Sequence, residues 1–383
     1  MNVKIFTMTH KKFDEPSDSI YIPLHVGRAA AKDLGYAGDD TGDSISEWNK
    51  YYGELTGVYW VWKNVRDADI VGVCHYRRYF LNEQRNLLSQ REYECILKDY
   101  DIITSNEMKS DKSCRDNYGE AHNRKDLDLT EEIIEEKYPD YADALETVLS
   151  GNSSYYGNLM VTSKNLFDSY AQWLFSIFFE LEKQIDVSSY DLYHQRVFGF
   201  LSEQLLKVWI LKHNLKVFEG RIGITAEKAE TVEFKLAMEQ LVKMHKITEA
   251  RKMFYEYLKL RPDVRLELSD LRGEIPIIEQ LLYIAEQEQE RGITGLNRNG
   301  GDLNAWIVHY RRTQQCLADL SSGEEVRQED ISYILEKNVS WVMCKVMMMN
   351  DIGEKITNQQ KTRQLLCKIY QTAGREYDYI GLQ

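Results

Sequence analysis

Positive charge and long apolar runs are both scarce in this sequence. Its 383 residues include 48 Lys and Arg against 61 Asp and Glu, which gives a net charge of −13 at pH 7. This excess of acid argues against general nucleic-acid binding, although a local basic pocket could still hold a phosphorylated ligand. No stretch approaches the roughly 18 to 20 apolar residues of a membrane helix, and the opening MNVKIFTMTH is too short and too polar for a secretory signal. The sequence therefore predicts a cytoplasmic protein.

Motifs that would indicate common cofactor or metal sites are also missing. Neither GxxxxGK[ST] nor GxGxxG occurs, which disfavours kinases and dehydrogenases. The cysteines are too widely spaced for a disulfide framework or a C-x-x-C zinc site, so we expect reduced thiols at Cys74, Cys95, Cys114, Cys316, Cys344 and Cys367. The remaining composition, 43% hydrophobic and 28% charged, is ordinary for a protein of two or three domains.

The stretch from Asp69 to Phe80 organises the rest of the chain. An apolar run without polar alternation, Ile70–Cys74, predicts a strand buried on both faces of a mainly parallel sheet. His75, Arg77 and Arg78 follow at once, so we expect them to project from the carboxyl end of that strand, where open α/β sheets bind ligands. Two guanidinium groups and an imidazole would bind an anion such as phosphate. Alternatively, the two arginines pair with carboxylates of this acidic protein and only hold a loop in place.

A polar loop before this strand is a second site candidate. Gly38–Ser46 packs three carboxylates, two glycines and three hydroxyls into nine residues, including Asp40 and Asp43. The alternative is a solvated turn that caps the next helix, which we expect over Trp48–Asn64. Asp67-Ala68-Asp69 matches the D-x-D metal motif of many nucleotide-sugar enzymes. It precedes its strand instead of following it, so we do not predict a metal there.

The following segments alternate between helix and strand patterns. Periodicity predicts a helix at 91–98 and a strand at 100–104. A helix that starts at Asp128 or Thr130 and ends at Lys137 follows, and a second helix ends at Leu149. We then expect a strand near 158–162 and an aromatic helix at 167–183. The charged stretch 109–128, which contains Asp126, lacks periodicity and could be either a mobile loop over a site or a surface insertion. Asp191, His194, Arg196 and Glu203 precede or open an apolar helix, which fits either a salt-bridged helix or a catalytic group.

Beyond Gly220 the sequence becomes helical. Amphipathic patterns predict helices at 227–245, 249–260, 277–290, 306–320, 328–349 and 357–372, and the first two read as a helical hairpin. A second H-Y-R-R, at His309 to Arg312, falls inside a helical pattern, so we interpret it as a chance match. The sequence thus predicts two domains, an α/β domain over residues 1–222 and an all-α domain over residues 223–383.

Several sequence blocks in one order resemble a known family. The blocks are IPLHVGRA, GDDTGDSISEWN, GELTGVYWVWKN, VGVCHYRRYF, YGNLMV and RVFGFLSE, and together they cover roughly residues 1–220. They resemble DUF4422, a family of bacterial glycosyltransferases for surface polysaccharides. The resemblance implies a GT-A-like nucleotide-binding mixed sheet flanked by helices and a nucleotide-sugar donor; in some relatives the sugar is thought to be galactofuranose. Leu24-His25 and Leu159-Met160 depart from the pattern, which leaves the sugar open.

The resemblance and the residue chemistry together give a site hypothesis. Arg77 and Arg78 would stabilise a departing nucleoside diphosphate in place of a metal, so no cofactor is required. A carboxylate would deprotonate the acceptor hydroxyl, and the candidates are Glu203, Asp191 and Asp126. The rival is Mn²⁺ or Mg²⁺ bound by His75 or His194 with Asp40 or Asp43. The predicted donor-binding residues are His10, Asp40, Asp43, Asn49, His75, Arg77, Arg78, Asn158 and Arg196.

The expected partners are a nucleotide-sugar donor, UDP-linked in our prediction, and a glycan or lipid-linked acceptor, with no nucleic acid. The C-terminal helices could contact an assembly complex or the inner face of the membrane, although their many glutamates disfavour an anionic surface. Two other functions stay open. A non-catalytic scaffold of a polysaccharide assembly complex would bind no nucleotide, and a nucleotidyltransferase would bind a nucleoside triphosphate with Mg²⁺.

Overall fold

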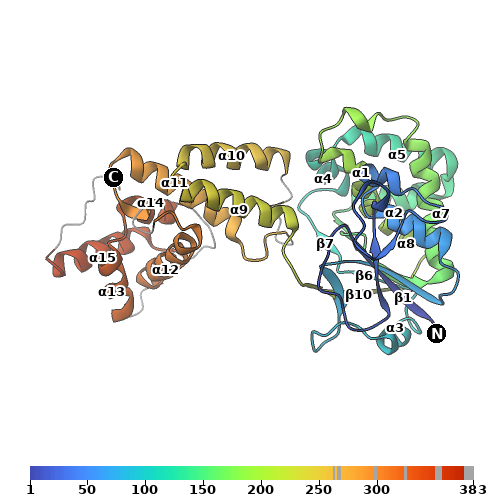
Figure 1. The fold of residues 1–383 in the computed structure, drawn as a ribbon, viewed down its shortest axis with the longest axis horizontal. Helices are drawn as coiled ribbons and strands as arrows, with labels where there is room; N and C mark the ends of the chain where they lie inside the picture. The colour runs from blue at the N-terminus through green and yellow to red at the C-terminus, as the bar shows by residue number, and fades with distance from the viewer. Residues whose placement is uncertain (262–263, 265–268, 297–299, 323–325, 350–355, 375–383) are drawn as a thin grey trace. The chain divides into compact units, whose positions relative to one another are not determined.

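The computed structural model describes all 383 residues except 262–263, 265–268, 297–299, 323–325, 350–355 and 375–383 (Figure 1). The chain separates into two compact units, Met1–Thr225 (unit 1) and Ala226–Gln383 (unit 2). The sequence predicts a boundary after residue 222. Unit 1 contains the strands, and the described part of unit 2 is helical. This agrees with the predicted class, an α/β domain followed by a helical region.

A mixed sheet forms the centre of unit 1. Its strands are β1 (Val3–Thr9), β2 (Tyr21–His25), β3 (Ala37–Gly38), β4 (Ile70–His75), β5 (Arg78–Leu81), β6 (Ile102–Ser105), β9 (Met160–Ser163) and β10 (Val217–Ile224). Strands β3, β2, β1 and β4 pair in parallel in that order. On its other side β4 pairs antiparallel with β9, and β6, β10 and β5 follow. A separate short ladder joins β7 (Met108–Lys109) to β8 (Ser153–Ser154).

Strand β4 is central, as its sequence predicts. Every residue from Ile70 to Cys74 is buried, because both faces of the strand are covered. Val71 and Val73 belong to a large core with most of the helices of unit 1, whereas Ile70 and Cys74 belong to a smaller core under α3 (Gln90–Ile96). Side chains alternate between the faces of a strand. His75, two residues after Val73, therefore points to the helix-covered face.

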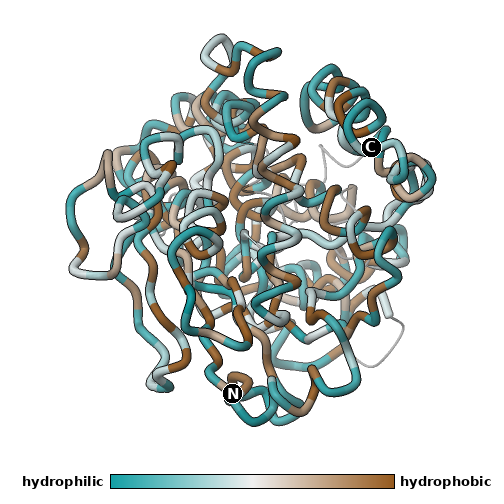
Figure 2. The backbone as a smooth tube through the Cα atoms, turned by 90° about the vertical axis from the view of Figure 1, so that its right-hand side faces the viewer, coloured by the Kyte–Doolittle hydropathy of each residue, from teal (hydrophilic) through white to brown (hydrophobic). Residues whose placement is uncertain are grey.

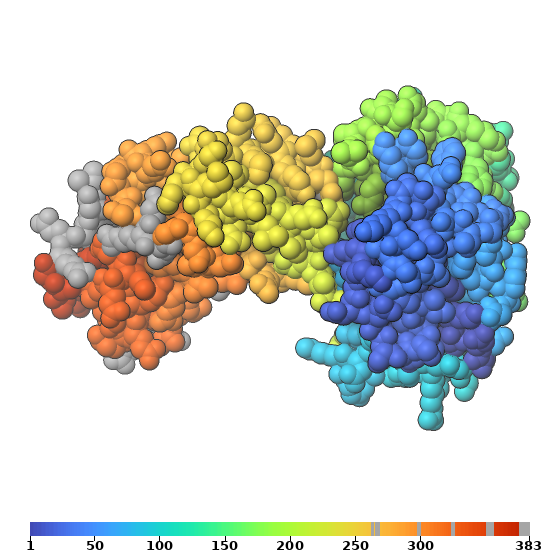
Figure 3. All heavy atoms as spheres, viewed as in Figure 1, coloured from blue at the N-terminus to red at the C-terminus, as the bar shows by residue number. Residues whose placement is uncertain are grey.

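The helices of unit 1 lie mostly on one face of the sheet, and the first segments of the chain, in blue, cover much of the face turned to the viewer in Figure 3. They are α1 (Asn49–Tyr52), α2 (Leu55–Asn64), α4 (Cys114–Ala121), α5 (Arg124–Lys137), α6 (Ala142–Ser150), α7 (Lys164–Leu181) and α8 (Val197–Lys212) (Figure 1). Short 3-10 turns stand at Arg28–Ala30, Ser46–Trp48, Pro139–Tyr141, Val187–Ser189 and His194–Arg196.

Two predictions of local structure in unit 1 are wrong, a loop and an unbroken helix. The stretch 109–128 is mostly helical and not a loop, because Ser113 caps α4 and α5 begins at Arg124. Charged residues conceal the periodicity of α4, which still buries Cys114 and Tyr118. The predicted helix Trp48–Asn64 is broken at Gly53, whose φ of +55° interrupts the helix between α1 and α2. The break places Glu54 at the start of α2.

Unit 2 contains α9 (Ala229–Lys243), α10 (Ile247–Leu260), α11 (Glu274–Glu290), α12 (Leu303–Ser322), α13 (Gln328–Lys337), α14 (Trp341–Met349) and α15 (Gln359–Thr372). The single helix predicted over 328–349 is wrong, because Asn338 adopts a left-handed conformation (φ +46°) that ends α13. His309 to Arg312 lie within α12, as predicted. Apolar stretches alternate with polar ones along the chain (Figure 2), and no described helix has the length and apolarity needed to cross a bilayer.

Candidate active site

The pairing of the strands brings several polar segments to one edge of the sheet. β1, β2, β3 and β4 are parallel, so their carboxyl ends lie at the same edge. β9 runs antiparallel to β4, with Met160 opposite Val73, so the residues just before β9 reach that edge too. The segment after β10 also reaches it, because Thr225 N–H donates to the Arg77 carbonyl over 3.0 Å. This edge is the place at which the sequence predicts a ligand site.

His75 is held in one tautomer at this edge. Its Nε2 lies 2.8 Å from the carbonyl oxygen of Gly157, which can only accept, so Nε2 carries a proton. Burial lowers the pKa of His75 to about 4, with Arg78 and Arg77 adding to the effect and Glu54 opposing it. At neutral pH His75 is therefore a neutral imidazole that fixes Gly157.

The two arginines after His75 occupy different environments. Arg77 lies in the turn after β4 and is only 6% exposed, whereas Arg78 opens β5 and is partly exposed. The Nε of Arg78 is buried and has no hydrogen-bond partner in the described part of the chain. A Cβ placed on Gly157 would lie 2.9 Å from Nη1 of Arg78, so the guanidinium reaches this glycine. A tight turn pairs Arg78 with His75, so both arginines lie at the carboxyl end of β4, where the sequence places them.

Glu203 approaches the same glycine from α8. Its Oε1 accepts a hydrogen bond of 2.8 Å from the N–H of Gly157, whose φ of +92° requires glycine. Burial raises the pKa of Glu203 to about 7; the charge of Glu54 adds to this rise, whereas the Gly157 hydrogen bond and the positive charges of Arg78 and Arg196 oppose it. A carboxyl group that titrates near neutral pH is well suited to accept and release a proton.

Asn158 is locked beside Glu203 by residues of two helices. Its φ of +52° is left-handed, and its side-chain Nδ2 donates to Oε1 of Glu54 over 2.7 Å. The hydroxyl of Ser202 donates to Oδ1 of Asn158 over 2.8 Å. An amide whose oxygen and nitrogen are both engaged cannot rotate freely. Asn158, a predicted donor-binding residue, is thus presented in a fixed orientation.

Glu54 and Ser202 belong to the cluster but were not predicted. Nη2 of Arg196, at the start of α8, lies 3.8 Å from Oε2 of Glu54. Burial by itself raises the pKa of Glu54, but His75, Arg196 and the Asn158 hydrogen bond together lower it below its ordinary value. Both residues lie within the family's sequence blocks, GELTGVYWVWKN and RVFGFLSE. A glutamate directly after the helix-breaking Gly53 is the signal that could have identified Glu54.

The first carboxylate of the acidic loop is structural. Asp39 is fully buried and accepts hydrogen bonds from the N–H groups of Gly27 (2.9 Å) and Arg28 (3.2 Å), from Oγ1 of Thr56 (2.6 Å) and from the hydroxyl of Ser46. These bonds tie the loop after β2 to the start of α2. Both carboxylate oxygens of Asp39 therefore accept hydrogen bonds from other residues of the protein.

The structure does not bring the other residues of this loop into the cluster. Asp40 pairs with Arg28 at 3.6 Å. Asp43 accepts from the hydroxyl of Tyr59, in the middle of α2, over 2.9 Å, and its backbone bonds to Asn64 at the end of that helix. Asn49 donates to the Gly53 carbonyl over 2.6 Å, so it shapes the turn between α1 and α2. Contacts within the protein account for the positions of Asp40, Asp43 and Asn49, without any contribution from a nucleotide-sugar substrate.

The two alternative bases and His10 have local partners. Asp191 accepts from the N–H groups of Tyr193 (2.9 Å) and His194 (3.0 Å) and lies 2.6 Å from Nδ1 of His194, so it caps the turn before α8. Asp126 is 2% exposed and accepts from the Tyr190 hydroxyl over 2.7 Å; burial raises its pKa. His10, exposed after β1, meets the Tyr76 ring edge to face. Among the three candidate bases, Glu203 is the one that accepts a hydrogen bond from Gly157.

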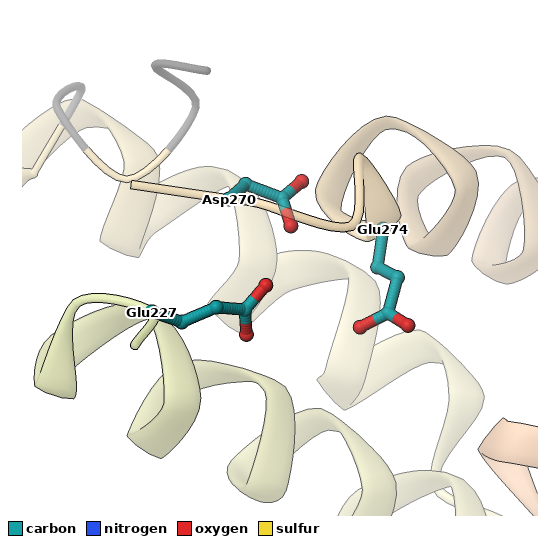
Figure 4. Close-up of side chains that lie close together, drawn as sticks. All are labelled: Glu227, Asp270 and Glu274. Carbon is teal, nitrogen blue, oxygen red and sulfur yellow. The ribbon is translucent and has the colours of Figure 1, made fainter. Parts of the chain in front are cut away.

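The predicted metal ligands do not converge in the structure. His75 is bonded to Gly157 and His194 to Asp191, while Asp40 and Asp43 have the partners given above. Within the described residues, one group of three acidic, histidine or cysteine side chains has ligand atoms within 4.8 Å of one another. It lies in unit 2 and consists of Glu227, Asp270 and Glu274 (Figure 4).

A lysine already occupies this acidic group. Nζ of Lys235 lies 2.9 Å from Glu227, 2.7 Å from Asp270 and 2.8 Å from Glu274. Burial by itself lowers the pKa of Lys235, but its bonds to the three carboxylates raise it above the ordinary value. The ammonium group supplies the positive charge that a metal ion would bring, so the group is an ion-pair network between α9 and the start of α11.

Comparison with known proteins places the cluster of unit 1 in a family. The family described as a domain of unknown function (DUF4422) matches residues 4–214, which is more than half of the chain. The chain belongs to the DUF4422 family. The matched region contains every residue of the cluster around Gly157, from Glu54 to Glu203, and ends before unit 2.

One solved glycosyltransferase structure is similar to this chain. The apo structure of the WbbM bifunctional glycosyltransferase is similar to this chain, with a TM-score of 0.54 and 34% sequence identity. The match covers 59% of this chain and 46% of that one, so this chain spans less than half the length of WbbM. No curated protein matches. The family description names no activity, and the similar solved structure is that of a glycosyltransferase.

Proposed function

We propose that this DUF4422 protein transfers a hexose, with galactofuranose as one candidate, from a UDP-linked donor to a glycan or lipid-linked acceptor in surface polysaccharide synthesis. The similarity to a glycosyltransferase supports the reaction class. The observation that carries the proposal is the cluster around Gly157, in which the unpaired Nε of Arg78 and the carboxyl of Glu203 lie at the ligand-binding edge of the sheet.

In the proposed reaction the acceptor hydroxyl attacks the anomeric carbon of the donor sugar. Its proton passes to the ionised Glu203, a new bond forms between the acceptor oxygen and the anomeric carbon, and the bond from that carbon to the diphosphate breaks. Negative charge then grows on the departing nucleoside diphosphate. A fixed guanidinium stabilises this charge more in the transition state than in the ground state.

Arg78 is the residue we assign to the diphosphate, with Arg77 contributing charge from its buried position. An unpaired buried Nε is costly unless it gains a partner, and a phosphate oxygen is a strong acceptor. Neutral His75 holds Gly157. The Nδ2 of Asn158 donates to Glu54 and Gly199, so the second acceptor position of its Oδ1 is the one assigned to a sugar hydroxyl. In this proposal no metal ion is required, and the protein contacts its acceptor in the cytoplasm, at the inner face of the membrane if the acceptor is lipid-linked.

Calorimetric titration with UDP and a panel of UDP-hexoses tests the donor site. We expect binding in EDTA by the wild type and a loss of about tenfold or more for Arg78→Ala, since charge-assisted hydrogen bonds are roughly twice as strong as neutral ones. Arg91→Ala, on exposed α3 at the other face of the sheet, serves as the matched control. Absence of binding with or without Mn²⁺ would overturn the donor site. Binding only with Mn²⁺ would overturn the metal-independent mechanism.

A further inference from the structure

Glu54 contacts two residues of the cluster around Gly157, Asn158 and Arg196. Its side chain is only 14% exposed and lies at the first turn of α2. One carboxylate oxygen accepts from Asn158, and the other lies 3.8 Å from the guanidinium of Arg196. The proposed reaction assigns no step to this carboxylate. A buried carboxylate costs free energy unless its partners compensate, so its contacts with both residues require an explanation.

The Asn158 contact controls the segment that faces Glu203. Asn158 and Gly157 have consecutive positive φ angles, and asparagine adopts this left-handed conformation more readily than most residues other than glycine. Glu54 and Ser202 hold the two ends of its amide. The preceding Gly157 presents its N–H to Glu203 and its carbonyl to His75. The bond that Asn158 donates to Glu54 therefore helps to keep Gly157, the partner of Glu203, in place.

Glu54 also contributes charge at this site. The charged and titratable groups that face Glu203 are Glu54 from α2, Arg78 from β5, Arg196 at the start of α8 and Tyr156 in the loop before β9. Glu54 alone among these carries a negative charge at neutral pH. Like charges disfavour the ionisation of a neighbouring carboxyl group. Removal of the Glu54 charge should therefore make Glu203 easier to ionise.

We infer that Glu54 is a positioning residue of this site: it fixes Asn158 and Arg196 and presents a second negative charge to Glu203. The inference rests on the proposed function only where Glu203 is taken as the base. Two variants separate the two effects. Glu54→Gln keeps an oxygen that can accept from Asn158 and removes the charge, whereas Glu54→Ala removes both.

The pH profile of kcat/KM gives the first test, with UDP release as the assay. We expect the acid limb of the wild type, near pH 7, to move to lower pH in both variants. We also expect Glu54→Ala to lose about tenfold more activity than Glu54→Gln because it loses the Asn158 hydrogen bond. Glu47→Gln, which removes an exposed glutamate from the turn before α1, should leave the limb in place. An unmoved limb in Glu54→Gln would overturn the charge part of the inference.

A second test needs no activity. A carboxyl whose pKa is raised on folding binds its proton more tightly in the folded state, so its contribution to stability is lost as the pH rises from about 4.5 towards 7. Glu203→Gln removes this loss. The change in melting temperature of unit 1 that the substitution causes should therefore be more favourable at pH 8 than at pH 5. In the Glu54→Gln background the same substitution should give a smaller gain.

The two tests distinguish failure of the inference from failure of the proposed function. An equal gain from Glu203→Gln in both backgrounds would overturn the inference, whatever the protein catalyses. Full activity of Glu203→Gln, together with unequal gains, would overturn the assignment of Glu203 as the base and leave the role of Glu54 intact.

Discussion

Each of the two units of this protein contains a cluster of carboxylates with basic residues, and the two clusters differ in what they leave for a ligand. In unit 2, Nζ of Lys235 reaches Glu227, Asp270 and Glu274 at 2.7 to 2.9 Å. In unit 1, Arg78 reaches Gly157, the hydrogen-bond partner of Glu203, and its buried Nε has no partner among the residues that the structure describes. The first cluster satisfies its own charges. The second leaves a donor and a titratable carboxyl for a ligand.

This difference separates a structural network from a candidate active site. A buried ion pair with all its partners present binds helices together, and it offers nothing to a ligand. Perturbed pKa values gather at functional sites because function needs groups that are not fully neutralised by their neighbours. Proximity of acidic groups alone would have selected the wrong cluster, since the unit 2 group has the tighter geometry.

Among substitutions in the two clusters, we expect Glu203→Gln in unit 1 to have the largest effect on the rate of transfer. If Glu203 is the base, transfer should fall by roughly 10²- to 10⁴-fold, because a glutamine cannot accept the proton. Donor binding should persist, since the amide oxygen of the substituted side chain can still accept from Gly157. Single-turnover rates and calorimetry on the same preparation measure the two quantities. Loss of binding in parallel with rate would show that the substitution disturbs the site as a whole.

For unit 2, replacing the lysine should affect stability and leave catalysis intact. Lys235→Met leaves three carboxylates close together without their cation, and we expect a loss of about 3–5 kcal/mol in the free energy of unfolding of unit 2. Urea denaturation measures it, with the exposed Lys252→Met as control. Added Ca²⁺ should restore part of the loss by replacing the ammonium group. Unchanged stability would contradict the structural role of the network.

The pH dependence of transfer should reflect Glu203 and not the acids of unit 2. The base acts when it is ionised, so kcat/KM should rise by about tenfold per pH unit below pH 7 and level off above it. Initial rates of UDP release between pH 5 and pH 9 would show this limb. A limb near pH 4 would point to a carboxyl with an ordinary pKa as the base.

Asp126→Asn is expected to have the smallest effect. Burial raises the pKa of Asp126, as it does that of Glu203, but its contact is with the Tyr190 hydroxyl. An asparagine can still accept that bond, so we expect stability to change by about 1 kcal/mol or less and turnover to stay within about twofold of the wild type. Thermal unfolding and steady-state rates check both. A large loss of turnover at unchanged stability would restore Asp126 as the candidate base.

Much of the fold of unit 1 could be predicted because its signals are local. The unbroken apolar run of β4 requires cover on both faces, and the structure supplies two separate cores for it. The helix α4 was missed because its charged residues hide the two buried positions, Cys114 and Tyr118. The break at Gly53 was missed because helical periodicity continues across it.

The sequence by itself determined the buried strand, the polar residues at its end and the blocks that identify the DUF4422 family. It also supplied Glu203, Arg78 and Asn158 as candidates. Only the tertiary structure decided which carboxylates have partners: Asp39 and Asp191 serve turns, Asp43 bonds to α2, and Glu54 joins Asn158. The physical reason is that burial and neighbouring charge set the state of a carboxyl group, and both arise from residues that are distant in the chain.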